Sequence, residues 1–297
     1  MSYQAYEGDG LVFGVLPYNG AFFTTRAGIV LVDVGCSRAT GQAMRQMVKD
    51  ARLPIALIVL THYHWDHSAN LDRYKDLRCV PIVLGNDSPL LQNGLKHPPE
   101  SSLFIAKERE TVSVGGLEVE LLPTPGHSDR GDDLCVWLPR QRILFCGDMV
   151  QPQGEMYSHC TGFSPVSNHA FGGSVLSSLQ ALLALPMETL VTGHSTVLHG
   201  ERAQRWISVT AQVLKREWEL AQKLVREHPR ASTKTISRWI FDTLAWERSY
   251  SPAAARKRKR NGHFKSYDYP GIAWFVEEAK KEAAAKRCGR RGHADFP

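Results

Sequence analysis

The chain has 297 residues, of which 43% are hydrophobic and 22% charged, a composition that is typical of globular proteins and argues against disorder. No apolar run approaches the roughly 18–20 residues that a membrane-spanning helix needs, so we expect no membrane association. Residues 1–200 hold 14 Lys and Arg against 19 Asp and Glu, whereas residues 201–297 hold 22 against 11; this change predicts a domain boundary near residue 200 and an anionic partner for the second domain.

Residues 1–200 alternate between short apolar strands and helices, a pattern that is typical of an α/β fold. The near-continuous apolar run at 54–60 predicts a strand that is covered on both faces. Residues 134–138 and 142–146 predict a hairpin. The other predicted strands are 27–34, 117–122 and 189–191, and the predicted helices are 40–52 and 173–185.

Residues 201–297 have helical patterns instead. Apolar spacing predicts a long amphipathic helix at 201–227, followed by helices at 232–245 and 270–286. Five consecutive basic residues run from Arg256 to Arg260, which we interpret either as a solvated linker or as a contact to phosphate. We therefore predict a basic, mainly helical C-terminal domain, with a winged-helix arrangement as one form of it.

The cysteines indicate the cellular compartment, because disulfide bonds are rare in the reducing cytoplasm. Of the six, none forms a C-x-x-C pair, and Cys36, Cys79, Cys135 and Cys146 lie in or beside apolar runs. We interpret them as reduced core residues, which predicts a cytoplasmic protein. No basic residue precedes Arg26, so we expect no cleaved secretory or organellar leader.

A dense cluster of metal-binding residue types follows the apolar run at 54–60. His62, His64, Asp66 and His67 fall within six residues, and imidazole nitrogens and carboxylate oxygens suit zinc and similar divalent cations. So compact a cluster cannot serve a single ion. On an irregular loop, His62 and His64 would point one way and Asp66 and His67 another, which predicts two adjacent metal ions.

Three further candidate ligands share one local setting. Each follows the end of an apolar strand and comes directly after a glycine, which permits a sharp turn and a close approach to an ion. Loops beyond strand ends are where α/β folds collect their sites. The three candidates are His127 after Gly126, Asp148 after Gly147 and His194 after Gly193.

Together these motifs resemble the metallo-β-lactamase superfamily. The resemblance rests on the H-x-H-x-D-H run, Asp33 upstream of it, Thr-Pro-Gly-His at 124–127, Gly-Asp at 147–148 and Gly-His at 193–194. It covers residues 10–200 and implies an αββα sandwich with a dinuclear site at the edge of its two sheets. By that resemblance Asp33 orients the ligand loop without binding metal, His62, His64 and His127 hold the first ion, Asp66, His67 and His194 hold the second, and Asp148 bridges both.

Individual positions indicate the branch of the family. The common zinc β-lactamases carry Arg where this chain has His67, usually carry Cys where it has Asp148, and are exported, so antibiotic hydrolysis is not expected. His64 stands where the flavodiiron branch has Glu. The pattern resembles that of the glyoxalase II-like and lactonase-like hydrolases, although Gln151 stands where acyl-homoserine lactonases place a Tyr.

The resemblance implies a hydrolase in which two divalent ions, zinc or else iron or manganese, lower the pKa of a shared water to around 7. Asp66 and Asp148 are the expected catalytic carboxylates. The predicted substrate is an ester, thioester or lactone of a small, anionic molecule, and residues 151–173 offer Tyr157, His159 and His169 as substrate contacts.

Three alternatives remain open. The basic C-terminal third favours a metal-dependent ribonuclease or other phosphodiesterase that binds nucleic acid. The same first ligands can also hold iron in a sulfur dioxygenase. The last alternative is a metal-loaded binding or regulatory protein on an inactive hydrolase fold.

Overall fold

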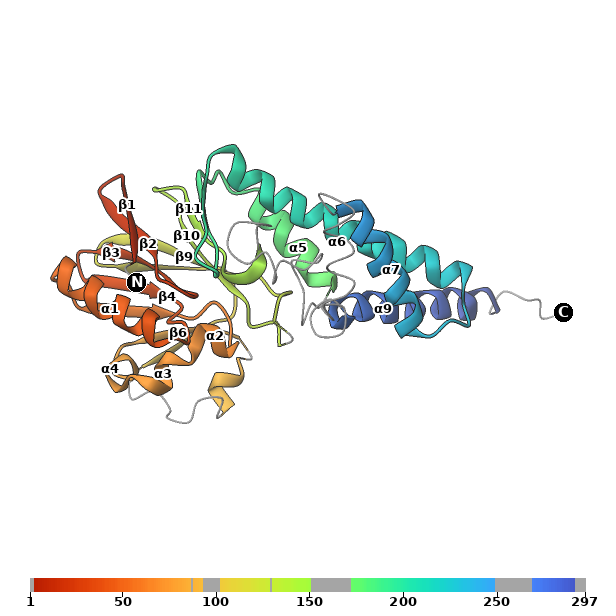
Figure 1. The fold of residues 1–297 in the computed structure, drawn as a ribbon, viewed down its shortest axis with the longest axis horizontal. Helices are drawn as coiled ribbons and strands as arrows, with labels where there is room; N and C mark the ends of the chain where they lie inside the picture. The colour runs from red at the N-terminus through yellow and green to blue at the C-terminus, as the bar shows by residue number, and fades with distance from the viewer. Residues whose placement is uncertain are drawn as a thin grey trace.

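The computed structural model describes residues 3–86, 88–92, 102–128, 130–150, 172–248 and 269–291. Within these ranges two β-sheets pack face to face, with helices on both outer faces (Figure 1). This arrangement confirms the expected αββα sandwich and the helical region that follows it.

The first sheet has seven strands in chain order, and its second half is parallel. Neighbouring residues of one strand face opposite layers: Val30 and Val32 of β4 pack between the sheets, whereas Ile29 and Leu31 pack against helices. Burial on both faces explains why β4 and β6 are apolar throughout, whereas β1 at the edge of the sheet is largely exposed. The strands are β1 (Gln4–Gly8), β2 (Leu11–Val15), β3 (Ala21–Thr25), β4 (Gly28–Val32), β5 (Ile55–Val59), β6 (Ile82–Gly85) and β7 (Leu103–Ala106).

The second sheet has six strands in the order β13-β12-β11-β10-β9-β8. The predicted hairpin is confirmed, because β10 pairs with β11 in antiparallel register, and β12 then adds in parallel to β11. The strands are β8 (Glu110–Val114), β9 (Leu117–Pro123), β10 (Leu134–Leu138), β11 (Ile143–Phe145), β12 (Thr189–Val191) and β13 (Val197–His199).

Helices cover the outer face of the first sheet. Met44 and Met47 of α1 (Arg38–Ala51), Leu71 of α3 (Asn70–Arg73) and Leu77 of α4 (Lys75–Arg78) join one buried cluster with that sheet. Ser37 caps α1, since its side chain accepts a hydrogen bond from the Thr40 N–H. The short helix α2 (Trp65–Ser68) precedes α3, and 3₁₀ turns lie at Pro89–Gln92 and Gly147–Met149.

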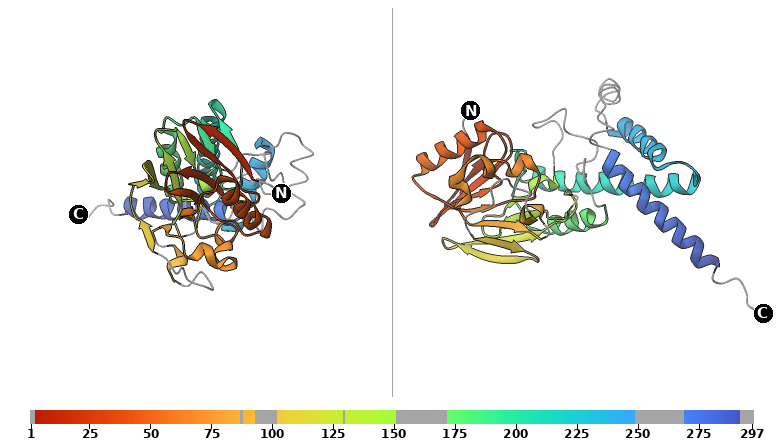
Figure 2. Two further views of the ribbon diagram at one scale, coloured as in Figure 1. Left: turned by 90° about the vertical axis from the view of Figure 1, so that its left-hand side faces the viewer. Right: turned by 90° about the horizontal axis from the view of Figure 1, so that it is seen from below.

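The outer face of the second sheet is covered by α5 (Gly172–Leu183) and α6 (Glu201–Glu227). Helices α7 (Thr233–Arg248) and α9 (Tyr269–Arg291) pack on α6, and this helical region extends away from the sandwich (Figure 2). One hydrophobic cluster runs from Leu144 of the sheet through Ile207 of α6 to Phe275 of α9. The sandwich and the helical region therefore share a continuous core across residue 200.

The three C-terminal helices were predicted to within a few residues, and the described parts of 201–297 contain no strand that could form a wing. The basic run from Arg256 to Arg260 lies outside the described residues. Across the described chain, none of the helices combines the length and apolar character that crossing a membrane requires.

Two expectations were wrong in detail. Cys135 and Cys146 are buried as expected, but Cys36 is only half-buried. Cys79 is exposed, because it caps the C-terminal end of α4 and precedes the next apolar run. The metal-binding cluster is not irregular throughout, since Trp65 to Ser68 form the helical turn α2.

Candidate metal centre

The seven candidate ligands converge at one edge of the sandwich, where strands of both sheets end. Within the described residues, donor atoms gather in three groups, each with its atoms within 4.8 Å of one another. The groups overlap in His62 and His67, so they form one connected cluster. His62, His64 and His127 form the first group, and Asp66, His67 and His194 form the second group; the remaining set, His62, His67 and Asp148, joins the two.

The first group consists of three imidazoles. His62 Nε2 lies 3.0 Å from His64 Nδ1, and His127 Nε2 lies 3.2 Å from the same atom. Zn–N bonds of 2.0–2.1 Å in a tetrahedral site would separate the nitrogens by roughly 3.3 Å. The chemistry and the spacing of these donors therefore fit a bound zinc ion.

Asp148 lies between this group and the second one. Its Oδ2 is 2.9 Å from His194 Nε2 and 3.6 Å from His127 Nε2, and its Oδ1 is 3.4 Å from His67 Nε2. One carboxylate therefore contacts imidazoles of both groups. The second group is completed by Asp66, whose Oδ2 lies 3.6 Å from His67 Nε2.

Asp33 contacts the ligand loop rather than the centre of the cluster. Its Oδ2 lies 2.8 Å from His67 Nδ1, and its two oxygens accept hydrogen bonds from the Thr61 N–H at 2.7 Å and the Thr61 hydroxyl at 2.8 Å. The Thr61 hydroxyl in turn lies 3.0 Å from His62 Nδ1. Asp33 thereby orients imidazoles of both donor groups.

Burial and charge set the protonation of these groups. Burial lowers the pKa of His62 well below its ordinary value and that of His127 to about 3, so both rings are neutral and can donate a lone pair to a cation. Burial alone would lower the pKa of His67, but the nearby Asp148 and Asp33 carboxylates outweigh burial and raise that pKa above its ordinary value. For Asp148, His194 and His67 outweigh burial and lower the pKa.

Sequence reasoning missed Asp133, which shapes the loop that carries His127. This buried carboxylate accepts hydrogen bonds from the backbone N–H groups of Gly126 at 2.9 Å, His127 at 3.1 Å and Ser128 at 2.9–3.0 Å. Burial raises the pKa of Asp133 to about 7 in spite of these donors. An acidic residue directly before the buried strand β10 was the available signal.

Asn19, in the loop between β2 and β3, was missed as well. It is buried, and its Nδ2 donates a hydrogen bond to Asp66 Oδ2 at 2.7 Å and lies 3.5 Å from His67 Nε2. The Asn-Gly pair at 19–20 is typical of a hairpin turn. It predicts the turn between β2 and β3, but it does not predict that Asn19 contacts the second group.

The cluster is open to solvent on one side. Asp66 and His194 are 29% and 23% exposed, whereas His67 and Asp148 are buried. Trp65, next to Asp66, is 70% exposed. Tyr157, His159 and His169, which were expected to contact substrate, lie outside the described residues.

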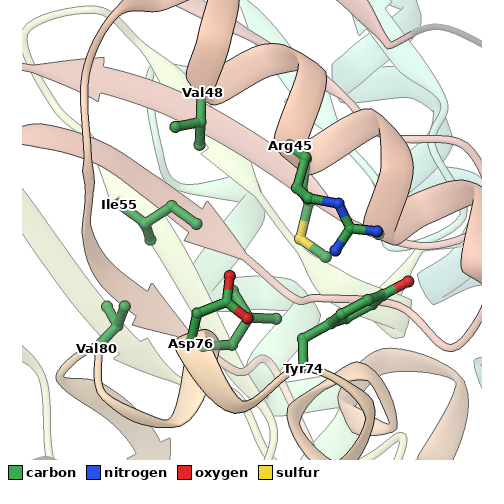
Figure 3. A pocket seen from close by; sticks show the side chains of 9 residues that line it. Arg45, Val48, Ile55, Tyr74, Asp76 and Val80 are labelled. Atoms are coloured by element: carbon green, nitrogen blue, oxygen red, sulfur yellow. The ribbon is translucent and has the colours of Figure 1, made fainter.

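A cavity of about 390 Å³ lies elsewhere, between α1 and α4 on the outer side of the first sheet (Figure 3). Met44, Val48 and Ile55 line it together with Arg45, whose guanidinium lies 4.5 Å from the centre of the Tyr74 ring. None of the seven candidate ligands lines this cavity, so it is separate from the metal centre.

Comparisons with known proteins agree with this geometry. The family model described as the metallo-beta-lactamase superfamily matches residues 14–194. A beta-lactamase-like protein 2 homolog from Caenorhabditis elegans is 24% identical over 279 residues, covering 88% of this chain and 86% of the relative. An atrochrysone carboxyl ACP thioesterase from Aspergillus fumigatus is 25% identical over 206 residues, covering 65% of this chain and 59% of the relative.

The fold has a counterpart among solved structures. A metallo-beta-lactamase family protein from Thermus thermophilus aligns with a TM-score of 0.60 at 16% identity, covering 92% of this chain and 90% of that one. At this identity the likeness concerns the fold alone, and it extends over the helical region as well as the sandwich.

Proposed function

This chain belongs to the metallo-β-lactamase superfamily, and we propose that it is a hydrolase that uses two divalent cations, zinc foremost, to cleave an ester, thioester or lactone of a small, anionic molecule. The observation that carries the proposal is the overlap of the donor groups. Two of them share His62, two share His67, and Asp148 contacts imidazoles on both sides. Such an arrangement suits two neighbouring cations better than one.

The residues have distinct roles in this proposal. His62, His64 and His127 would hold one cation and Asp66, His67 and His194 the other, while Asp148 contacts imidazoles of both groups. Two such cations supply a water of lowered pKa and polarise the substrate carbonyl. The partly exposed Asp66 and the buried Asp148 balance the positive charge, and either carboxylate can pass a proton to the leaving group.

An acyl substrate is supported by the surface beside the opening. Trp65 is exposed next to Asp66 and offers an apolar face to an acyl chain. The Aspergillus relative is named as a thioesterase, which supports a thioester as the first substrate class to test.

One observation favours a second candidate function. Residues 201–297 carry 22 basic residues against 11 acidic ones, so a phosphodiester such as RNA would meet favourable charge there. We also propose 1–200 as the catalytic domain and 201–297 as a helical domain that holds the anionic part of the substrate. The family match ends at residue 194 and α6 begins at Glu201, which supports this division.

A side-by-side assay tests the proposal. Hydrolysis of a thioester, a lactone and a single-stranded RNA is measured with and without chelator, for the wild type, Asp148→Ala and a control, Asp76→Ala, that removes an exposed carboxylate of α4. We expect thioester or lactone turnover that is abolished by chelator and by Asp148→Ala but not by Asp76→Ala. Cleavage of RNA alone, lost when Arg256 to Arg260 are neutralised, would instead establish the second candidate.

A further inference from the structure

Asn19 brings a polar side chain to the second donor group from a loop that carries none of the seven candidate ligands. Only 4% of this residue is exposed, and its amide nitrogen lies 2.7 Å from Asp66 Oδ2 and 3.5 Å from His67 Nε2. We propose that Asn19 is a positioning residue that holds the Asp66 carboxylate in place and so sets the affinity of the second cation. The inference rests on the two-cation centre of the proposed function.

The backbone at Asn19 is built for this contact. Asn19 has φ +64° and follows Tyr18 at φ +56°, so two consecutive residues other than glycine adopt the left-handed conformation. That conformation costs most residues about 1–2 kcal/mol, and asparagine is among the few that adopt it routinely. A bond from the Leu16 N–H to the Gly20 carbonyl at 2.8 Å closes the loop around Asn19.

The loop is fixed independently of Asp66. The Thr40 hydroxyl donates to the Tyr18 carbonyl at 3.1 Å, which ties the loop to α1. On the other side, the Gly20 N–H donates to the Gly193 carbonyl at 3.3 Å and the Ser195 hydroxyl to the Leu16 carbonyl at 2.6 Å. The loop backbone on either side of Asn19 is therefore held from both halves of the sandwich, independently of Asp66.

Asp66 needs such a partner more than the buried ligands do. It lies on the four-residue helix α2 and is 29% exposed, whereas His67 is fully buried and held by Asp33. A carboxylate at the solvent edge has several rotamers, and ordering it costs side-chain entropy when a cation binds. The donated hydrogen bond from Asn19 selects one orientation in advance, as hydrogen-bonded neighbours of metal ligands commonly do.

The effect should be confined to the second cation. The contacts of Asn19 are with Asp66 and His67, whereas the backbone of His127, in the first group, is held by Asp133. Loss of the Asn19 amide therefore leaves the first group intact. A general loosening of the edge would weaken both sites together.

Asn19→Gly tests the inference, because glycine adopts φ +64° without strain and only the amide is lost. Tyr18→Gly is the matched control, since it places glycine at the neighbouring left-handed residue and keeps the amide. Metal-free wild type and both variants are titrated with Zn²⁺ by calorimetry, and the Co²⁺ absorption spectrum is recorded after one and two equivalents. We expect the Kd of the second ion to rise about 10- to 100-fold in Asn19→Gly alone, with the first unchanged.

The contrary outcomes are separable. If the wild type binds two ions and Asn19→Gly binds both as tightly, the role of Asn19 is refuted and the proposed function is untouched. If Asn19→Gly and Tyr18→Gly weaken the binding of the second ion equally, the role of Asn19 is also refuted, because the loop backbone and not the amide would then be responsible. If the wild type binds fewer than two ions, the two-cation centre fails and this inference fails with it.

Discussion

Gly193→Ala adds a single methyl group at the point where the two halves of the centre come closest. A Cβ on Gly193 would lie 2.8 Å from His67 Cε1 and 2.9 Å from the Gly147 carbonyl carbon, and it would overlap Asp148 Oδ1 more severely still. Gly193 is not among the residues with positive φ, so alanine has no backbone penalty there. Any effect must come from the collision with the side chains of Asp148 and His67 and with the Gly147 backbone.

The size of the effect follows from these distances. Ordinary carbon contacts are about 3.5–4.0 Å, so the His67 ring or the added methyl must move by roughly 0.7–1.2 Å. The backbone cannot withdraw freely, because the Gly193 N–H donates to the Gly147 carbonyl at 2.7 Å. Overpacking of this kind costs about 1–3 kcal/mol of unfolding free energy. Displaced ligands should also weaken cation binding at least tenfold.

The measurement compares Gly193→Ala with Gly8→Ala, where a Cβ would meet nothing within 4 Å. Zn²⁺ titration and thermal unfolding of the metal-free proteins give the cation affinity and the stability separately. We expect both to fall in Gly193→Ala and neither to fall in Gly8→Ala. Wild-type cation affinity in Gly193→Ala would refute the placement of Asp148 and His67 at the centre.

Three further predictions concern residues around the centre. Asp133→Ala leaves three buried N–H groups without their acceptor, so denaturant titration should show about 2–5 kcal/mol lost, and an unchanged midpoint would contradict this role. Trp65→Ala should raise KM for a long-chain thioester several-fold without changing the metal content, and an unaltered KM would exclude Trp65 from substrate binding. In metal-free protein the folded pKa of His127, about 3, lies below the unfolded value, so stability falls as pH drops from about 6.5 to 3, by up to ~1.4 kcal/mol per pH unit. His127→Gln should flatten that slope in urea unfolding from pH 4 to 7, and an equal slope would show that another group is responsible.

The sandwich strands that flank the candidate ligands could be predicted because they are buried on both faces and so are apolar throughout. The strand at 54–60 and the hairpin at 134–146 are of this kind. Strands β1 to β3, β6 to β8 and β13 were not predicted. β1 is largely exposed, and β2 and β3 are interrupted by small and polar residues. Their pairing is set by partners in the folded sheet rather than by their own pattern.

At the metal centre, too, residues that form a local sequence pattern could be predicted, and residues that tertiary structure brings in could not. His62, His64, Asp66 and His67 are dense enough in sequence to be recognised at once, and Asp33 was recognised through the resemblance. Asn19 lies 47 residues from Asp66 and has no local chemical signature, so only the tertiary structure brings the two together.

Zinc anomalous scattering from crystals grown with Zn²⁺ tests the two-cation centre most directly. We expect two peaks about 3.5–4 Å apart, one among His62, His64 and His127 and one among Asp66, His67 and His194, with Asp148 beside both. A single peak, or peaks away from these side chains, would contradict it.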